Sequence, residues 1–153
     1  EDYTHEEWKM IRETKKIMLG DKFAKDIKVT GTAVRVPIGI GHGESIYFEV
    51  SDTEKANVAG IRQVLSTADG VVLQDDPANQ LYPQPLNAEG KRETFVGRIR
   101  RDVENDGSFH MWVVADNLLK GAAWNTVQIA ERLVALDLVH VPANVTIPDP
   151  KAE

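Results

Sequence analysis

The sequence predicts an α+β domain in which helices cover one face of a mixed, largely antiparallel sheet. Three observations indicate this class. Apolar residues recur at helical spacing in three segments, short β-favouring stretches lie between these segments, and an Asn-Asp-Gly turn at 105–107 predicts a hairpin. The 153 residues suffice for one domain with its own core. We expect that domain to span residues 1–137 and residues 138–153 to form a proline-containing tail.

The first predicted helix spans residues 5–19. Thr4 and Glu7 have the spacing of a capping box, in which each side chain bonds to the backbone N–H of the other residue. Trp8, Ile11 and Met18 share one face at helical spacing. Gly20 is expected to end the helix.

Two strands and a glycine loop are predicted next. Residues 27–37 are rich in β-favouring residues, which predicts a strand that ends at Pro37. Residues 39–43 contain three glycines and predict a loop, and a second strand is expected at 45–50.

A second helix is predicted over residues 52–68. Ser51 and Glu54 have the spacing of another capping box. The apolar stripe of this helix consists of Val58, Ile61 and Leu65.

The remaining elements follow from turn signals. Residues 71–74 predict a short strand, and the proline-rich residues 75–90 predict a surface loop. Strands at 94–103 and 109–115 flank the Asn-Asp-Gly turn, and a third helix is predicted at 121–136.

Composition excludes several classes of function. The formal net charge of −6 does not favour nucleic acid or an anionic membrane as a partner. No apolar run approaches the roughly 20 residues that span a bilayer. The chain has no cysteine, which excludes a disulfide or a cysteine nucleophile of its own and fits a cytoplasmic setting. No histidine pair has metal-ligand spacing, so we expect no metal site.

Glu6 and Lys9 form the first candidate site. Residues three apart on a helix project from the same side, so a surface ion pair is one interpretation. The alternative is a pair of opposite charges that holds a zwitterionic or phosphorylated substrate.

Arg35 and His42 form the second candidate site. A strand arginine is commonly solvated, but a guanidinium also offers a planar fork that fits a carboxylate. A histidine on a glycine loop is commonly just exposed, but its imidazole can transfer a proton near neutral pH. The glycines at 39–43 lead to a strand and not to a helix, so they do not indicate a dinucleotide-binding turn.

Several blocks in order resemble the aspartate-semialdehyde dehydrogenase family over roughly residues 1–133. The blocks are Glu6-Glu7-Trp8-Lys9, Glu13-Thr14-Lys15-Lys16-Ile17, Thr32-Ala33-Val34-Arg35-Val36-Pro37 with Gly41-His42, Gln74-Asp75-Asp76-Pro77, Tyr82-Pro83 with Pro85-Leu86-Asn87, Val96-Gly97-Arg98-Ile99-Arg100 with Asp102, Asp116-Asn117-Leu118 with Lys120-Gly121-Ala122-Ala123, and Asn125 to Glu131.

The resemblance implies the C-terminal, GAPDH-like substrate and dimerisation domain of an NADP-dependent oxidoreductase. That enzyme reduces aspartyl phosphate to aspartate semialdehyde and phosphate through a cysteine thioester, in lysine, threonine and methionine biosynthesis. By the family pattern Arg35 binds the α-carboxylate, Glu6 the α-ammonium and Lys9 the phosphate. His42 is the acid/base, and the resemblance places Asn125 at NADP.

The resemblance also implies that this chain begins past the dinucleotide-binding Rossmann half. The nucleophilic cysteine and a nearby glutamine would then come from that half, and we expect the chain to be inactive alone and to form a homodimer. Ala33 and Gly43 replace a cysteine and a serine that are common in the family. Two alternatives remain. One is a non-catalytic dimerisation or regulatory module, and the other is a reductase of N-acetylglutamyl phosphate, in which Glu6 would lack a cation to bind.

Overall fold

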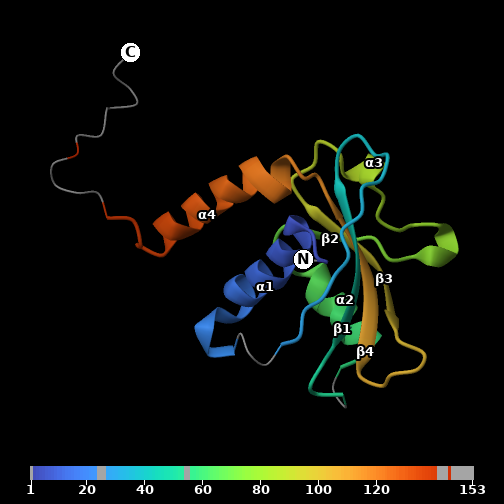
Figure 1. Ribbon diagram of the computed structural model, residues 1–153. Helices are drawn as coiled ribbons and strands as arrows, with labels where there is room; N and C mark the ends of the chain where they lie inside the picture. The colour runs from blue at the N-terminus through green and yellow to red at the C-terminus, as the bar shows by residue number, and fades with distance from the viewer. Residues whose placement is uncertain (1, 24–26, 54–55, 141–144, 146–153) are drawn as a thin grey trace. The chain divides into compact units, whose positions relative to one another are not determined.

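A computed structural model describes residues 2–23, 27–53, 56–140 and 145. The chain divides into two compact units, Glu1–Pro37 and Ile38–Glu153. The first unit contains a single described helix, and the second contains a four-stranded mixed sheet with helices (Figure 1). The mixed sheet and its helices confirm the predicted α+β class.

Helix α1 extends from His5 to Phe23. The predicted capping box is confirmed, because Thr4 N donates to Glu7 Oε2 at 2.8 Å and Glu7 N donates to Thr4 Oγ1 at 3.3 Å. The helix continues past Gly20, so the predicted end was wrong. A glycine inside a helix costs only about 1 kcal/mol relative to alanine, which a capped helix can absorb.

The strand predicted at 27–37 was also wrong. The described residues of this segment form no strand, and the backbone N–H of Ala33 donates instead to Glu7 Oε1 at 3.0 Å. β-favouring side chains do not make a strand unless a neighbouring strand supplies the ladder hydrogen bonds.

The sheet has the order β1-β4-β3-β2. β1 pairs antiparallel with β4, β3 pairs antiparallel with β4, and β2 pairs parallel with β3. The predicted hairpin is therefore confirmed (Figure 1). The strands are β1 (His42–Glu49), β2 (Val71–Leu73), β3 (Thr94–Arg101) and β4 (Ser108–Ala115).

β1 begins earlier than predicted. The glycine loop was expected to continue to Gly43, but His42 already pairs with Ala115 and Gly43 with Val114. A glycine next to a strand can extend that strand when the neighbouring strand has residues opposite it that can pair with it through backbone hydrogen bonds.

Helix α2 (Val58–Ser66) is shorter than the helix predicted at 52–68. Its N-cap is Asn57, whose Oδ1 accepts from Gly60 N at 2.9 Å. The predicted cap partner Glu54 lies outside the described residues. The predicted apolar stripe is half-buried, whereas Val64 on another face is 68% exposed.

The segment 75–90 contains more structure than a loop. A 3₁₀ turn, η1 (Pro77–Asn79), and a short helix, α3 (Pro85–Ala88), interrupt it, and each has a proline in its first turn. Ala88 is fully buried and belongs to the main hydrophobic cluster with Phe95 and Val114. This cluster anchors α3 beside the ends of the central strands.

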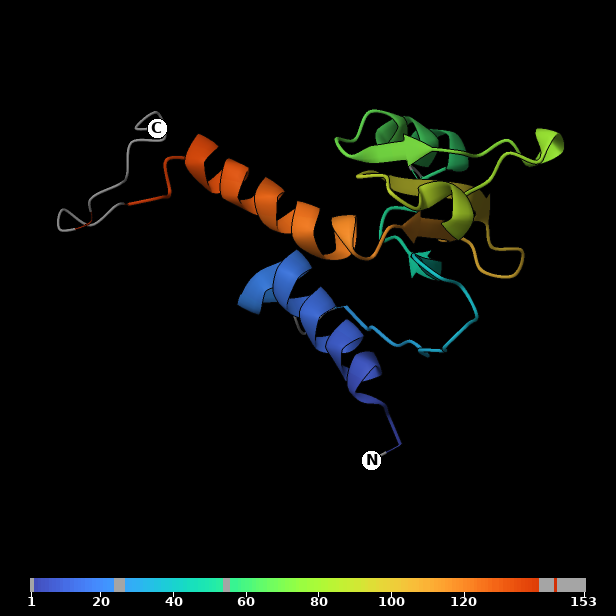
Figure 2. The same cartoon turned by 90° about the horizontal axis from the view of Figure 1, so that it is seen from above.

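A π-helical turn, η2 (Leu119–Ala123), leads directly into α4 (Trp124–Ala135). Figure 2 shows η2 and α4 as one continuous helical rod. The helix predicted at 121–136 is therefore confirmed with an earlier start. In the part of the chain that the structure describes, no helix is long and apolar enough to cross a membrane. The predicted tail lies mostly outside the described residues.

Asp102 organises the turn of the hairpin. Its Oδ1 accepts from Glu104 N and Asn105 N, both at 2.9 Å, and its Oδ2 lies 2.7 Å from His110 Nε2. The bond from His110, followed by the two backbone bonds, lowers the pKa of Asp102 from 3.8 to about 2.

A depressed folded-state pKa predicts how Asp102 affects stability with pH. Its contribution is complete above the unfolded-state pKa of 3.8 and is lost as the pH falls through about 2. Urea unfolding should therefore show Asp102→Asn less stable than the wild type at pH 7, with the difference disappearing near pH 2. Asp106→Asn, at a side chain that is 93% exposed, is the matched control and should show little difference throughout. A constant gap between wild type and Asp102→Asn from pH 7 to pH 2 would contradict this role.

Candidate functional site

Glu6 and Lys9 form an ion pair on the first turns of α1. Lys9 Nζ lies 3.2 Å from Glu6 Oε1 and 3.3 Å from Oε2. The side chain of Glu6 is 59% exposed and that of Lys9 is 42% exposed. An exposed pair of this kind contributes only a few tenths of a kcal/mol to stability, so both charges can reorganise around a ligand at little cost.

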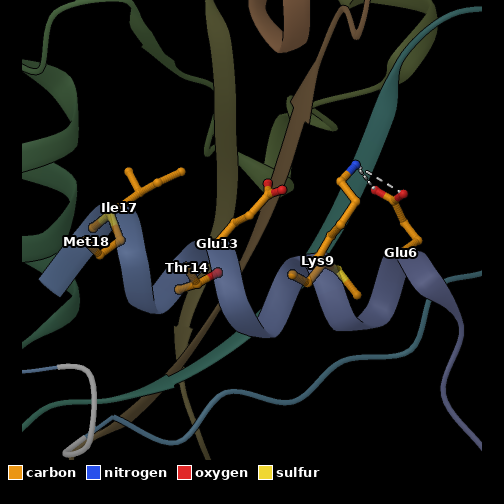
Figure 3. Close-up of a pocket in the computed structure, with 7 residues that line it drawn as sticks. Glu6, Lys9, Glu13, Thr14, Ile17 and Met18 are labelled. Atoms are coloured by element: carbon orange, nitrogen blue, oxygen red, sulfur yellow. Dashed lines mark hydrogen bonds and ion pairs between the residues drawn. The ribbon is translucent and has the colours of Figure 1, made fainter. Parts of the chain in front are cut away.

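A depression of about 310 Å³ runs along the same side of α1. Figure 3 shows Glu6, Lys9, Glu13 and Ile17 projecting from this side of the helix. Glu13 was not among the predicted site residues, although its position seven residues, or about two turns, after Glu6 could have indicated the shared face. The lining residues are Glu6, Lys9, Met10, Glu13, Thr14, Ile17 and Met18.

Glu7 joins the start of α1 to the segment that carries Arg35. Its side chain is buried, and its two oxygens accept from Thr4 N and Ala33 N. These two backbone bonds, from Thr4 first and Ala33 second, lower the pKa of Glu7. Arg35 lies two residues after Ala33 with an exposed side chain. The ionised Glu7 therefore holds the backbone near Arg35 against the helix that carries Glu6 and Lys9.

His42 is the first residue of β1, and its side chain is exposed. The preceding Gly41 has a φ of +110°, a conformation open to glycine and strained for other residues. Gly41 N donates to Asn117 Oδ1 at 2.8 Å. On the other side of His42, the ring of Trp112 covers Gly43 so closely that a Cβ on Gly43 would overlap the ring. The ring is itself held in place, because Trp112 Nε1 donates to Pro83 O at 3.0 Å. The backbone is thus held on both sides of an accessible imidazole.

Asn125 lies in the first turn of α4 with its side chain exposed. Glu6, Lys9 and Arg35 belong to the first unit, and His42 and Asn125 belong to the second. Within the first unit, the structure brings Glu6 and Lys9 into contact and connects Arg35 to their helix through Glu7. The described residues contain no cluster of three or more His, Asp or Glu side chains that could hold a metal ion.

Comparison with known families matches residues 1–120 to the family described as semialdehyde dehydrogenase, dimerisation domain. The aspartate-semialdehyde dehydrogenase of Bacillus subtilis is 57% identical over 137 residues, and that of Aquifex aeolicus is 50% identical over 137 residues. Each alignment covers 90% of this chain and 38% of the relative, so the chain spans well under half the length of these enzymes.

Solved structures agree with the sequence relatives. The aspartate semialdehyde dehydrogenase II of Vibrio cholerae superposes with a TM-score of 0.77 at 40% identity, over 87% of this chain and 37% of that chain. The enzyme of Candida albicans, solved with NADP, superposes with a TM-score of 0.71 at 28% identity, over 90% of this chain and 44% of that chain. The chain therefore belongs to the semialdehyde dehydrogenase family and contains its dimerisation domain.

Proposed function

We propose that this chain supplies the substrate-binding and proton-transfer residues of an aspartate-semialdehyde dehydrogenase. The reaction would be the NADPH-dependent reduction of aspartyl phosphate to aspartate semialdehyde and phosphate, in lysine, threonine and methionine biosynthesis. The observation that carries this proposal is that the family match over residues 1–120 contains Glu6, Lys9, Arg35 and His42 together.

The first three of these residues suit an amino-acid phosphate. The guanidinium of Arg35 would bind the α-carboxylate through two parallel hydrogen bonds. The carboxylate of Glu6 would accept from the α-ammonium, and the ammonium of Lys9 would bind the phosphate. In the free chain Glu6 and Lys9 neutralise each other, and substrate would replace that contact with one opposite charge for each.

His42 would carry the proton. A neutral imidazole can take the proton of a thiol, and the resulting imidazolium can return it to the substrate oxygen on which negative charge develops. This chain has no cysteine, so the thiol would come from a Rossmann half outside this sequence. The exposed position of His42 at the start of β1 leaves its ring accessible to such a partner.

The hydride would come from NADPH. The exposed amide of Asn125 offers both a donor and an acceptor, which fits a carboxamide or a hydroxyl group of that cofactor. The glycines at 39–43 lead into β1, so the dinucleotide-binding turn would belong to the Rossmann half as well. We expect the assembled enzyme to be cytoplasmic and homodimeric, with residues 1–137 as the domain and 138–153 as its tail.

Reassembly of the enzyme tests this proposal. The chain should show no turnover alone, and mixing it with the separately produced Rossmann half of the Bacillus subtilis relative should restore phosphate-dependent NADP reduction with aspartate semialdehyde. Arg35→Lys should raise the KM for aspartate semialdehyde by about tenfold, because lysine cannot form the paired hydrogen bonds, and leave kcat nearly unchanged. Lys28→Arg, an exposed cation outside the candidate site, is the matched control. Turnover by the pure chain alone would contradict the proposal.

A non-catalytic dimerisation module is the second candidate, supported by the description of the matched family. It predicts a particle of about twice the 17.0 kDa chain mass by light scattering and no turnover when the Rossmann half is added. A dimer that also restores turnover would favour the enzyme.

A further inference from the structure

The turn before His42 is held by a residue 76 positions away in the sequence. Asn117 Oδ1 accepts from Gly41 N at 2.8 Å. Gly41 is buried, and a Cβ at this position would lie 3.4 Å from both Ala115 O and Pro85 Cβ. The turn is thus packed between the end of β4 and α3, and Asn117 supplies its side-chain anchor.

Asn117 is itself fixed by the residue before it. Asp116 is only 3% exposed, and its Oδ1 accepts from Leu118 N at 2.8 Å and Leu119 N at 3.1 Å. Its Oδ2 accepts from Gly90 N at 2.8 Å. These bonds fix the backbone where β4 gives way to η2, and they define where the Asn117 amide can reach.

His42 stands at the end of a ladder. It pairs with Ala115, the last residue of β4, so the pairing between β1 and β4 does not extend to Gly41. The preceding glycine has wide conformational freedom and would let the first residue of β1 fray. The bond from Gly41 to Asn117 supplies a constraint at the position where the ladder stops.

We propose that Asn117 is a positioning residue that fixes the imidazole of His42 for proton transfer by holding the backbone N–H of Gly41. This inference rests on the proposed function of His42. An acid/base group misplaced by about 1 Å can lose roughly a hundredfold in rate, so a restraint on the residue before His42 matters to catalysis.

Amide exchange in the isolated 153-residue chain tests the anchor. Asn117→Ala should speed exchange of the Gly41 amide by about tenfold, and Asn117→Asp, which keeps an acceptor oxygen, should restore protection. The order parameters of Gly41 and His42 should fall in the alanine variant only. Asn57→Ala removes another asparagine bond to a glycine amide, at the start of α2, and should leave Gly41 unchanged. Equal exchange of Gly41 in wild type and Asn117→Ala would overturn the proposal.

A double-mutant cycle in the reassembled enzyme tests the catalytic role. Asn117→Ala should lower kcat by about tenfold to a hundredfold with little change in the KM for aspartate semialdehyde, and Asn117→Asp should recover most of it. In a His42→Ala background the same substitution should cost nothing further, because its effect passes through the imidazole. Additive losses would overturn the positioning role. If wild-type halves give no turnover, the proposed function fails, and the exchange measurement still decides whether Asn117 holds the turn.

Discussion

His42→Ala should lower kcat of the reassembled enzyme by about 10²- to 10⁴-fold, the usual contribution of a positioned acid/base group. The KM for aspartate semialdehyde should change little, because Arg35, Glu6 and Lys9 are the residues proposed to bind substrate. The fold should survive, because the His42 side chain is exposed and the backbone rung to Ala115 does not depend on it. Steady-state kinetics and circular dichroism of the same samples measure both effects.

The matched control for this experiment is His140→Ala. His140 is also exposed but lies beyond the end of α4, so its loss should leave kcat within about twofold of wild type. Reassembled His42→Ala with a kcat equal to that of the control would show that the proton carrier is another group.

Gly97→Ala should destabilise the second unit by about 3 kcal/mol or more, the upper range for overpacking a rigid site. A Cβ at position 97 would collide with the carbonyl oxygen of Gln74 and lie 2.7 Å from Pro83 Cδ. Gln74 is held in place because its N–H donates to Val96 O at 2.8 Å. Neither neighbour is the free end of a flexible side chain, so the strain cannot be relieved without moving the backbone of β3 or of the segment that carries Gln74 and Pro83.

Gly39→Ala is the control for the glycine substitution. Nothing lies within 4 Å of a Cβ at position 39, and its φ is not in the left-handed region, so stability should change by only about 0.5 kcal/mol. Urea unfolding of both variants measures the difference. Equal midpoints would mean that the loop carrying Gln74 and Pro83 can retreat from β3 at little cost.

The parts of the fold that depend on residues close together in the sequence were predictable. Thr4 and Glu7 cap the first helix through bonds three residues apart, and the Asn-Asp-Gly turn closes the hairpin as expected. The strand expected at 27–37 failed because strand formation depends on a partner elsewhere in the chain, and Ala33 N donates to Glu7 instead.

The same distinction applies to the candidate site. The contact between Glu6 and Lys9 follows from helical spacing, and the family resemblance assigned expected roles to Arg35 and His42. The bond between Gly41 and Asn117 could not be predicted, because it depends on the register of β1 against β4 and on the turn that leads into η2. Residues that arrange a reacting group from a distance carry no local sequence signal of their own.

The close packing of Trp112 over Gly43 gives the strand of His42 an optical reporter. The chain has three tryptophans, Trp8, Trp112 and Trp124, and only Trp112 lies in the sheet. With Trp8 and Trp124 replaced by phenylalanine, the indole emission would come from the ring that packs over Gly43, the residue next in sequence to the proposed proton carrier. Quenching or a wavelength shift on adding substrate or the Rossmann half could then be followed in real time, without any attached label.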